Sequence, residues 1–177
     1  EGERGRITAL DRAGTLTVLA AGYAGKRFNR PNDLWVAPAG AVYFSDPNYG
    51  RPELSQEGEY VYRISPDRTT LTPVITDLVR PNGLIGTPDG QTLYVTDAGA
   101  GQTWRYRITP TGALTDAALF ASYGGDGMTI DERGNIYLAA DGILVFAPDG
   151  QLIERIAVPE RPTNLTFCGP QRRTLFI

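Results

Sequence analysis

Oxygen-bearing side chains open four similar segments of the sequence. Asn32, Asn82, Asp126 and Asn164 each stand just before a short, largely apolar run. Amide and carboxylate oxygens are the ligands that calcium prefers, so a fold that gathers these side chains would form a divalent-cation site. A structural role is also open for each of them, because Asn and Asp are common turn residues whose side chains bond nearby backbone amides.

The residue types that are missing narrow the possible chemistry. The sequence has no histidine, which excludes Ser-His-Asp and Cys-His catalysis and histidine-bound zinc. Its single cysteine, Cys168, permits neither an internal disulfide nor a cysteine-rich metal site. Its single lysine, Lys26, is followed by an arginine, so there is no phosphate-binding P-loop. Polar chemistry must therefore come from carboxylates, amides, hydroxyls and arginines, which suit a hard cation such as calcium or magnesium.

Two kinds of β-hairpin alternate along the chain and must position those side chains. In the first kind, a candidate Asn or Asp leads into a short strand, a turn, and a second strand rich in β-branched and aromatic residues. The second kind alternates apolar and polar residues around turns such as Pro-Asp-Gly. The first kind covers residues 32–46, 82–97, 126–139 and 164–177, and the second covers 5–19, 60–75, 104–115 and 143–156.

This repeat predicts an all-β fold, a β-propeller of four-stranded blades. The leading Asn or Asp recurs about every 40 to 50 residues, which is the length of one blade. We expect the first kind of hairpin to supply inner strands and the second kind outer strands. Inner strands surround the central channel, so their leading side chains would meet at its mouth.

Three further polar residues lie close to the expected channel mouth in the sequence. Arg30 precedes Asn32 by two residues and would reach the same rim, where a guanidinium could bind a carboxylate or a hydroxylated substrate. A solvated loop arginine is the alternative. Asp46 and Asp97 each close a second inner strand, and we expect them to cap turns rather than to do chemistry.

The hairpins amount to about four blades. Residues 1–177 are expected to form a single propeller domain or a fragment of one. Unpaired sheet edges at both ends would favour part of a larger ring over a small closed ring. Self-association or a further chain segment would then complete that ring.

Charge and hydropathy disfavour two classes of partner. The net charge is −3 and the arginines are dispersed, so there is no basic stripe for nucleic acid. No apolar run approaches the roughly 20 residues that a membrane span needs. Residues 1–4 have neither the cationic start nor the apolar stretch of a signal peptide. This favours the cytoplasm but leaves the compartment open, because the chain is expected to begin inside a repeat and a targeting segment could precede it.

Several of these segments together resemble a known family. They are similar to motifs of the gluconolactonase, regucalcin and luciferin-regenerating family, and the resemblance covers nearly the whole chain. It implies a six-bladed β-propeller that hydrolyses lactones with a divalent cation on the central axis, usually Ca²⁺, with Zn²⁺, Mg²⁺ or Mn²⁺ as other possibilities. The matching segments are residues 30–34, 42–47, 80–84, 93–97, 125–128 and 134–137.

The resemblance also implies roles for particular residues. It makes Asn82 and Asp126 metal ligands, and Asp126 the general base as well. Asn32 falls where the family has an amide near the metal and the substrate, and Arg30 where some members have a substrate-binding arginine. The family's first blade supplies a glutamate ligand with no counterpart here, because Glu1 and Glu3 precede an expected outer hairpin. The resemblance thus implies about two thirds of a six-bladed ring.

The expected activity is metal-assisted lactone hydrolysis, in which Asp126 activates water while Arg30 and Asn32 orient a small-molecule lactone. Two alternatives remain at this stage. The same site could act on an organophosphate, because a dication polarises a phosphoryl oxygen as well as a carbonyl. The propeller could also be a noncatalytic module that binds a ligand or a protein.

Overall fold

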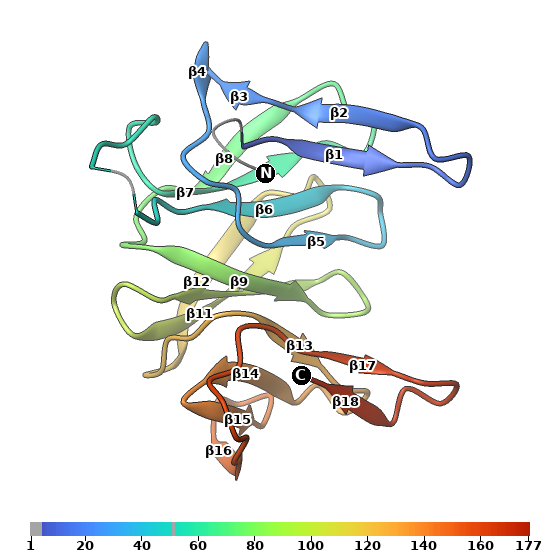
Figure 1. The fold of residues 1–177 in the computed structure, drawn as a ribbon, viewed down its shortest axis with the longest axis vertical. Helices are drawn as coiled ribbons and strands as arrows, with labels where there is room; N and C mark the ends of the chain where they lie inside the picture. Colours follow the sequence, from blue (N-terminus) through green and yellow to red (C-terminus); the bar gives the residue numbers. More distant parts are fainter. Residues whose placement is uncertain (1–4, 51) are drawn as a thin grey trace.

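The computed structural model describes residues 5–50 and 52–177, which form strands and turns and no helix. Their main feature is three antiparallel four-stranded sheets arranged side by side (Figure 1). The first consists of β5 (Leu34–Val36), β6 (Val42–Asp46), β7 (Tyr60–Ile64) and β8 (Leu71–Ile75). The second consists of β9 (Pro81–Gly86), β10 (Thr92–Asp97), β11 (Gln102–Ile108) and β12 (Leu114–Ala121). The third consists of β13 (Met128–Ile130), β14 (Ile136–Ala140), β15 (Gly142–Phe146) and β16 (Leu152–Ile156).

Three two-stranded ribbons complete the described structure. β1 (Ile7–Leu10) pairs with β2 (Leu16–Ala20), and β17 (Thr166–Cys168) pairs with β18 (Thr174–Phe176). The third ribbon, β3 (Gly22–Tyr23) with β4 (Lys26–Arg27), was not predicted from the sequence. It is closed by Ala24 and Gly25, which both have positive φ, as the tightest hairpin turns require.

Each four-stranded sheet is built from neighbouring strands in chain order, with every connection a hairpin. Sheets meet chiefly through their first strands: β9 contacts β5 and β6 on one side and β13 on the other, and β13 contacts β17. The prediction that the first kind of hairpin forms the inner half of a blade is therefore confirmed. The fold is part of a β-propeller, as the sequence predicts.

Apolar layers between successive blades hold the array together. Between the first and second sheets lie Tyr43, Val61, Leu84 and Val95, with Trp35 packed against them. The layer between the second and third sheets and those flanking the two end hairpins are built in the same way, from alternate residues of facing strands. Because successive side chains of a strand point to opposite faces, the consecutive apolar residues Val42, Tyr43 and Phe44 of β6 supply apolar layers to both sides of the blade.

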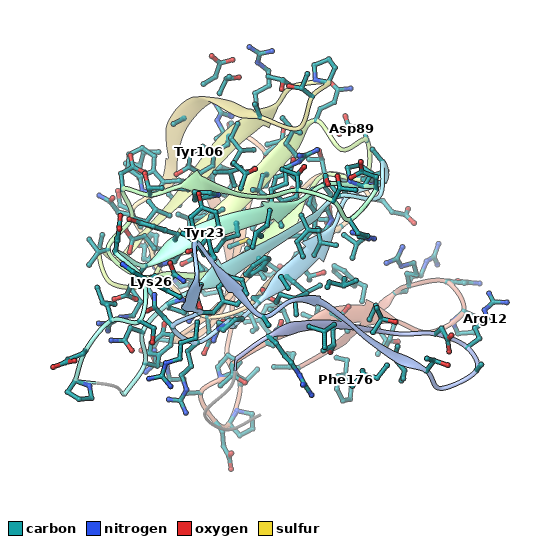
Figure 2. All side chains as sticks on the ribbon, turned by 90° about the horizontal axis from the view of Figure 1, so that it is seen from above. Arg12, Tyr23, Lys26, Asp89, Tyr106 and Phe176 are labelled. Carbon is teal, nitrogen blue, oxygen red and sulfur yellow. The ribbon has the colours of Figure 1, made fainter. Side chains whose placement is uncertain are left out.

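The two rims of this array differ in structure. The tight turns within the repeated hairpins lie on one rim, and the loops that lead from one of these hairpins to the next lie on the other. In Figure 2 the β1–β2 turn with Arg12 and the β9–β10 turn with Asp89 lie on one side, whereas Lys26 lies on the opposite side. We call these the hairpin rim and the loop rim. Nowhere in the described chain is there a helix that could span a membrane.

Candidate functional site

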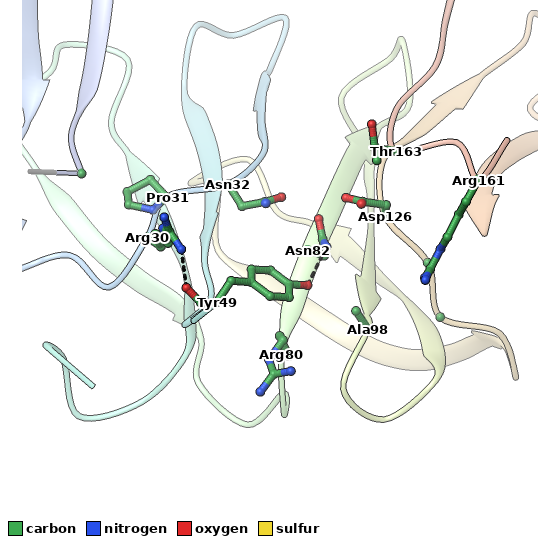
Figure 3. Close-up of a pocket in the computed structure, with 13 residues that line it drawn as sticks. Arg30, Pro31, Asn32, Tyr49, Arg80, Asn82, Ala98, Asp126, Arg161 and Thr163 are labelled. Atoms are coloured by element: carbon green, nitrogen blue, oxygen red, sulfur yellow. Dashed lines mark hydrogen bonds between the residues drawn. The ribbon is translucent and has the colours of Figure 1, made fainter. Parts of the chain in front are cut away.

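A pocket of about 780 Å³ opens on the loop rim where the inner strands of successive blades converge. Its wall comes from the segments that precede β1, β5, β9, β13 and β17, from the start of β9, and from the loops that follow β6 and β10 (Figure 3). The pocket thus draws on residues far apart in the chain. It is lined by Gly5, Arg30, Pro31, Asn32, Tyr49, Arg80, Asn82, Ala98, Gly124, Gly125, Asp126, Arg161 and Thr163.

Close approach of β9 to the segment before β13 brings Asn82 beside Asp126. Gly83 makes this approach possible, because a β-carbon there would lie 2.1 Å from the backbone oxygen of Asp126. Figure 3 shows the side chains of Asn32, Asn82 and Asp126 turned toward the same space. Three segments, each about one blade apart in the sequence, therefore present polar side chains to the same space.

The amide of Asn82 has one satisfied end and one unsatisfied end. The side chain is only 4% exposed, and its Nδ2 donates a hydrogen bond of 2.7 Å to the hydroxyl of Tyr49. Its Oδ1 is buried without a hydrogen-bond partner among the described residues. A buried acceptor left unpaired is costly, so a cation or a donor at this point would remove that cost. The donor set therefore fits a metal ion.

Asp126 is the single carboxylate among the described residues that line the pocket. Burial raises its pKa above the ordinary value of 3.8, while a hydrogen-bonding interaction with Asn82 and the positive charge of Arg161 act in the opposite direction. No group of three or more His, Cys, Asp or Glu side chains that could hold a metal occurs in residues 5–50 and 52–177. The oxygen donors here are mostly amides, with one negative charge.

Arg30 and Asn32 lie on the opposite wall, where buried Asp46 holds their segment in place. Asp46 is fully buried and accepts hydrogen bonds from the backbone N–H groups of Asn29 and Arg30, at 2.9 and 2.7 Å. The guanidinium of Arg30 donates through Nη1 to the backbone oxygen of Tyr49. The side chain of Asn32 is exposed to the pocket. The structure thus brings together four of the residues singled out from the sequence: Arg30, Asn32, Asn82 and Asp126.

Asp97 repeats the role of Asp46 in the next blade. It accepts hydrogen bonds of 2.9 Å from the backbone N–H groups of Val79 and Arg80, and it is 2% exposed. It also accepts bonds from Gly99 and Ala100 in the loop that follows β10. Both aspartates are therefore structural acceptors that fix the loops of this rim, as their positions at strand ends suggested.

The prediction that Asn164 joins the other three side chains is wrong. Its Oδ1 accepts a hydrogen bond of 2.8 Å from the N–H of Leu165, and it is not part of the pocket wall. Thr163 lines the pocket in its place. Asp33, next to Asn32, shows the same local bond to its following residue, Leu34. Asn164 is therefore the counterpart of Asp33, and the alignment of the last repeat with the others is shifted by one residue.

Sequence reasoning missed four polar side chains that line the pocket: Tyr49, Arg80, Arg161 and Thr163. An available signal was the Arg-Pro pair, which precedes Asn32, Asn82 and Thr163 alike and would have corrected the register of the last repeat. No comparable signal marks Tyr49, which reaches the pocket from the loop after β6. Glu1 and Glu3, the two acidic residues compared with the family's glutamate ligand, lie outside the described residues.

These features define a β-propeller with a polar pocket at the meeting point of its inner strands. The chain belongs to the SMP-30/Gluconolactonase/LRE-like family, whose model matches residues 2–177. It is 38% identical over 182 residues to a gluconolactonase of Zymomonas mobilis, an alignment that covers 91% of this chain and 51% of the relative. The resemblance proposed from the sequence is thereby confirmed.

Solved structures of gluconolactonase and regucalcin superimpose well on this chain. A gluconolactonase from Xanthomonas campestris superimposes with a TM-score of 0.88 at 37% identity, covering 99% of this chain and 62% of that one. A regucalcin from Agrobacterium tumefaciens, described as a calcium-binding protein, superimposes with a TM-score of 0.76 at 26% identity, covering 93% and 58%. The chain spans about half the length of the curated relatives it matches.

Proposed function

We propose that this pocket is the active site of a metal-dependent lactone hydrolase. The observation that carries the proposal is the convergence of Asn82 and Asp126 on one point, with the buried Oδ1 of Asn82 left without a partner in the described structure. Relatives named gluconolactonase, and a pentonolactonase of Haloferax volcanii that is 31% identical, support lactones as the substrate class.

Asn82 and Asp126 would hold the cation, and Asn32 would complete the amide side of the site. Calcium fits this donor set best, because amide and carboxylate oxygens are hard ligands and no His or Cys stands among the described residues that line the pocket. The calcium-binding regucalcin from Agrobacterium tumefaciens supports the same choice. A bound dication would polarise the lactone carbonyl and stabilise the oxyanion that forms during attack.

The residues of the chain would supply the remaining steps. Asp126 accepts a proton from the attacking water, whose oxygen forms a bond to the carbonyl carbon. The ring C–O bond then breaks, and the proton passes to the departing ring oxygen to give a hydroxy acid. Arg30 and Asn32 face the same space from the opposite wall and orient the substrate. Tyr49 accepts the hydrogen bond from Nδ2 of Asn82 and so keeps Oδ1 directed into the pocket.

Parallel assays on three substrates test this proposal. We expect the purified protein to hydrolyse gluconolactone and an aliphatic lactone in the presence of Ca²⁺, to lose this activity in a chelator, and to regain it when Ca²⁺ is restored. An organophosphate assayed beside them tests the related phosphotriester activity. No lactone hydrolysis with any divalent cation, together with no calcium binding by calorimetry, would contradict the proposal and favour a noncatalytic binding propeller.

A further inference from the structure

The loop rim carries a second repeated feature, a set of arginines around the pocket. Arg30, Arg80 and Arg161 each precede by two residues a side chain that lines the pocket, and each is followed by proline. All three arginines line the pocket themselves. The third blade departs from this pattern, because Gly124 occupies the equivalent position before Asp126. Three segments from different parts of the chain therefore each contribute one guanidinium to the same opening.

The three arginines differ in how their charge is used. The guanidinium of Arg30 donates to the backbone oxygen of Tyr49, a neutral acceptor, so its positive charge is not balanced by that contact. Arg80 lies over the ring of Tyr49, 5.3 Å from its centre, and pairs with Glu59 at 3.5 Å. Arg161 is exposed and has no ion pair or hydrogen bond within the described part of the chain.

The carboxylates near this opening leave that positive charge available to a ligand. Glu59 is paired with Arg80 and also accepts the N–H of Asn48. Asp33 is not part of the pocket wall and accepts the N–H groups of Leu34 and Leu84. Among the described residues, Asp126 is the one carboxylate that lines the pocket, where its charge interacts with that of Arg161 and where the proposed function commits it to a cation and to water. Arg161, and Arg30 on the opposite wall, therefore form no ion pair with another residue that the structure describes.

We propose that the pocket selects lactones that carry an additional acidic group, a carboxylate or a phosphate, and that Arg161 is the main residue that recognises this group. A neutral sugar lactone needs hydrogen-bond donors but no net positive charge, whereas guanidinium groups match the planar or tetrahedral oxygens of carboxylate and phosphate. This inference rests on the proposed lactone hydrolysis and names the substrate class for it.

Substrate comparison separates the two sources of negative charge. The probes are neutral gluconolactone, a lactone of glucaric acid, which adds a carboxylate, and gluconolactone phosphorylated on its terminal hydroxyl. We expect kcat/KM to be about tenfold higher for at least one acidic lactone than for the neutral one, through a lower KM. That advantage should decline as NaCl is raised, because salt screens charges at an exposed rim.

Arg161→Gln tests the assignment directly. We expect it to raise KM for the preferred acidic lactone about tenfold, with a much smaller change in kcat/KM for the neutral lactone. The matched control is Arg133→Gln, which removes an exposed arginine on the hairpin rim. The inference is overturned if neutral and acidic lactones are hydrolysed equally well and Arg161→Gln alters neither.

A binding measurement tests anion recognition independently of lactone hydrolysis. Calorimetry with glucarate, which has two carboxylates, and with uncharged glucitol needs no turnover. If no lactone is hydrolysed, the proposed function fails, but preferential binding of glucarate that is lost in Arg161→Gln would still support anion recognition at this rim. Equal, weak binding of glucarate and glucitol would reject it.

Discussion

The two rims of the propeller carry the same kinds of polar residue, but the hydrogen-bond partners of these residues differ between the rims. On the hairpin rim, Asp89 accepts hydrogen bonds from the hydroxyl of Thr87 and the N–H of Gln91, and Asp131 accepts the N–H groups of Arg133 and Asn135. Partners there are close neighbours in sequence. On the loop rim, Asn82 bonds the hydroxyl of Tyr49 from another blade, and its Oδ1 stays unpaired in the described structure.

The pKa values of the carboxyl groups also differ between the two rims. Hydrogen bonds within the turn lower the pKa of Asp89. Burial raises the pKa of Asp33 and of Asp126 above the ordinary value, although Asp33 accepts two backbone N–H groups that oppose the shift. A carboxylate satisfied by its own turn stabilises the fold, whereas one that is buried and directed at a shared space is available for chemistry. The difference between the rims is one of partners, not of composition.

The largest expected effect is on catalysis, from Asp126→Asn. We expect loss of at least about 100-fold in kcat for lactone hydrolysis, because the amide cannot accept the proton of the attacking water. Steady-state assays in saturating Ca²⁺ measure it, and circular dichroism checks that the fold is kept. Asp131→Asn on the hairpin rim is the control and should retain full activity. Full turnover in Asp126→Asn would contradict the proposal that Asp126 is the general base and that the loop-rim pocket is the active site.

A smaller effect is expected from Tyr49→Phe, which removes only the hydroxyl that accepts the hydrogen bond of Asn82. We expect calcium affinity to fall about 10-fold, because residues that orient a metal ligand typically contribute on that scale. Calorimetric titration with Ca²⁺ gives the affinity without reference to turnover. Tyr123→Phe is matched to it, since that tyrosine also lies under an arginine, Arg155, but lines no part of the pocket. Equal calcium affinity in the two variants would argue against a positioning role for Tyr49.

Gly83→Ala probes the close approach on which the loop rim depends. The added β-carbon would meet the backbone oxygen of Asp126, so we expect a loss of about 1–3 kcal/mol in the free energy of unfolding. Urea denaturation measures it. Gly101→Ala separates this steric effect from backbone strain, because Gly101 has φ of 68° with no atom within 4 Å of an added β-carbon. A Gly83→Ala protein as stable as the parent would show that the two segments can separate freely.

The smallest effect is expected on the hairpin rim, from Asp89→Ala. Loss of its hydrogen bonds to Thr87 and Gln91 should lower the free energy of unfolding by less than about 1 kcal/mol at pH 7, with lactone hydrolysis unchanged. Because folding lowers the pKa of Asp89, its contribution is complete above the ordinary pKa of 3.8 and disappears as the pH falls through the folded value. In urea titrations, the difference in unfolding free energy between the two proteins should therefore be smaller at pH 3 than at pH 7. A larger difference at pH 3 would contradict this account.

Much of the fold could be predicted from the sequence, because blade structure is local. Each hairpin pairs segments adjacent in the chain, so strand alternation and turn residues were enough to predict the inner and outer halves of each blade. The β3–β4 ribbon was missed because two-residue strands carry no periodic signal. The lack of histidine and the scarcity of lysine and cysteine in the sequence likewise restrict the chemistry to oxygen ligands and arginines, whatever the fold.

The tertiary structure decided which of these residues act together. Whether Asn164 or Thr163 faces the pocket depends on a register of one residue, and a shift of one residue in an extended chain turns a side chain to the other face. The bond between Tyr49 and Asn82, the unpaired oxygen beside Asp126 and the grouping of Arg30, Arg80 and Arg161 all join segments from different blades. The packing of the blades around a common axis determines which of these residues lie close together. No pattern along the chain predicts these contacts. The sequence by itself determined the blades and the kind of ligand atoms, and the packing of those blades determined the site.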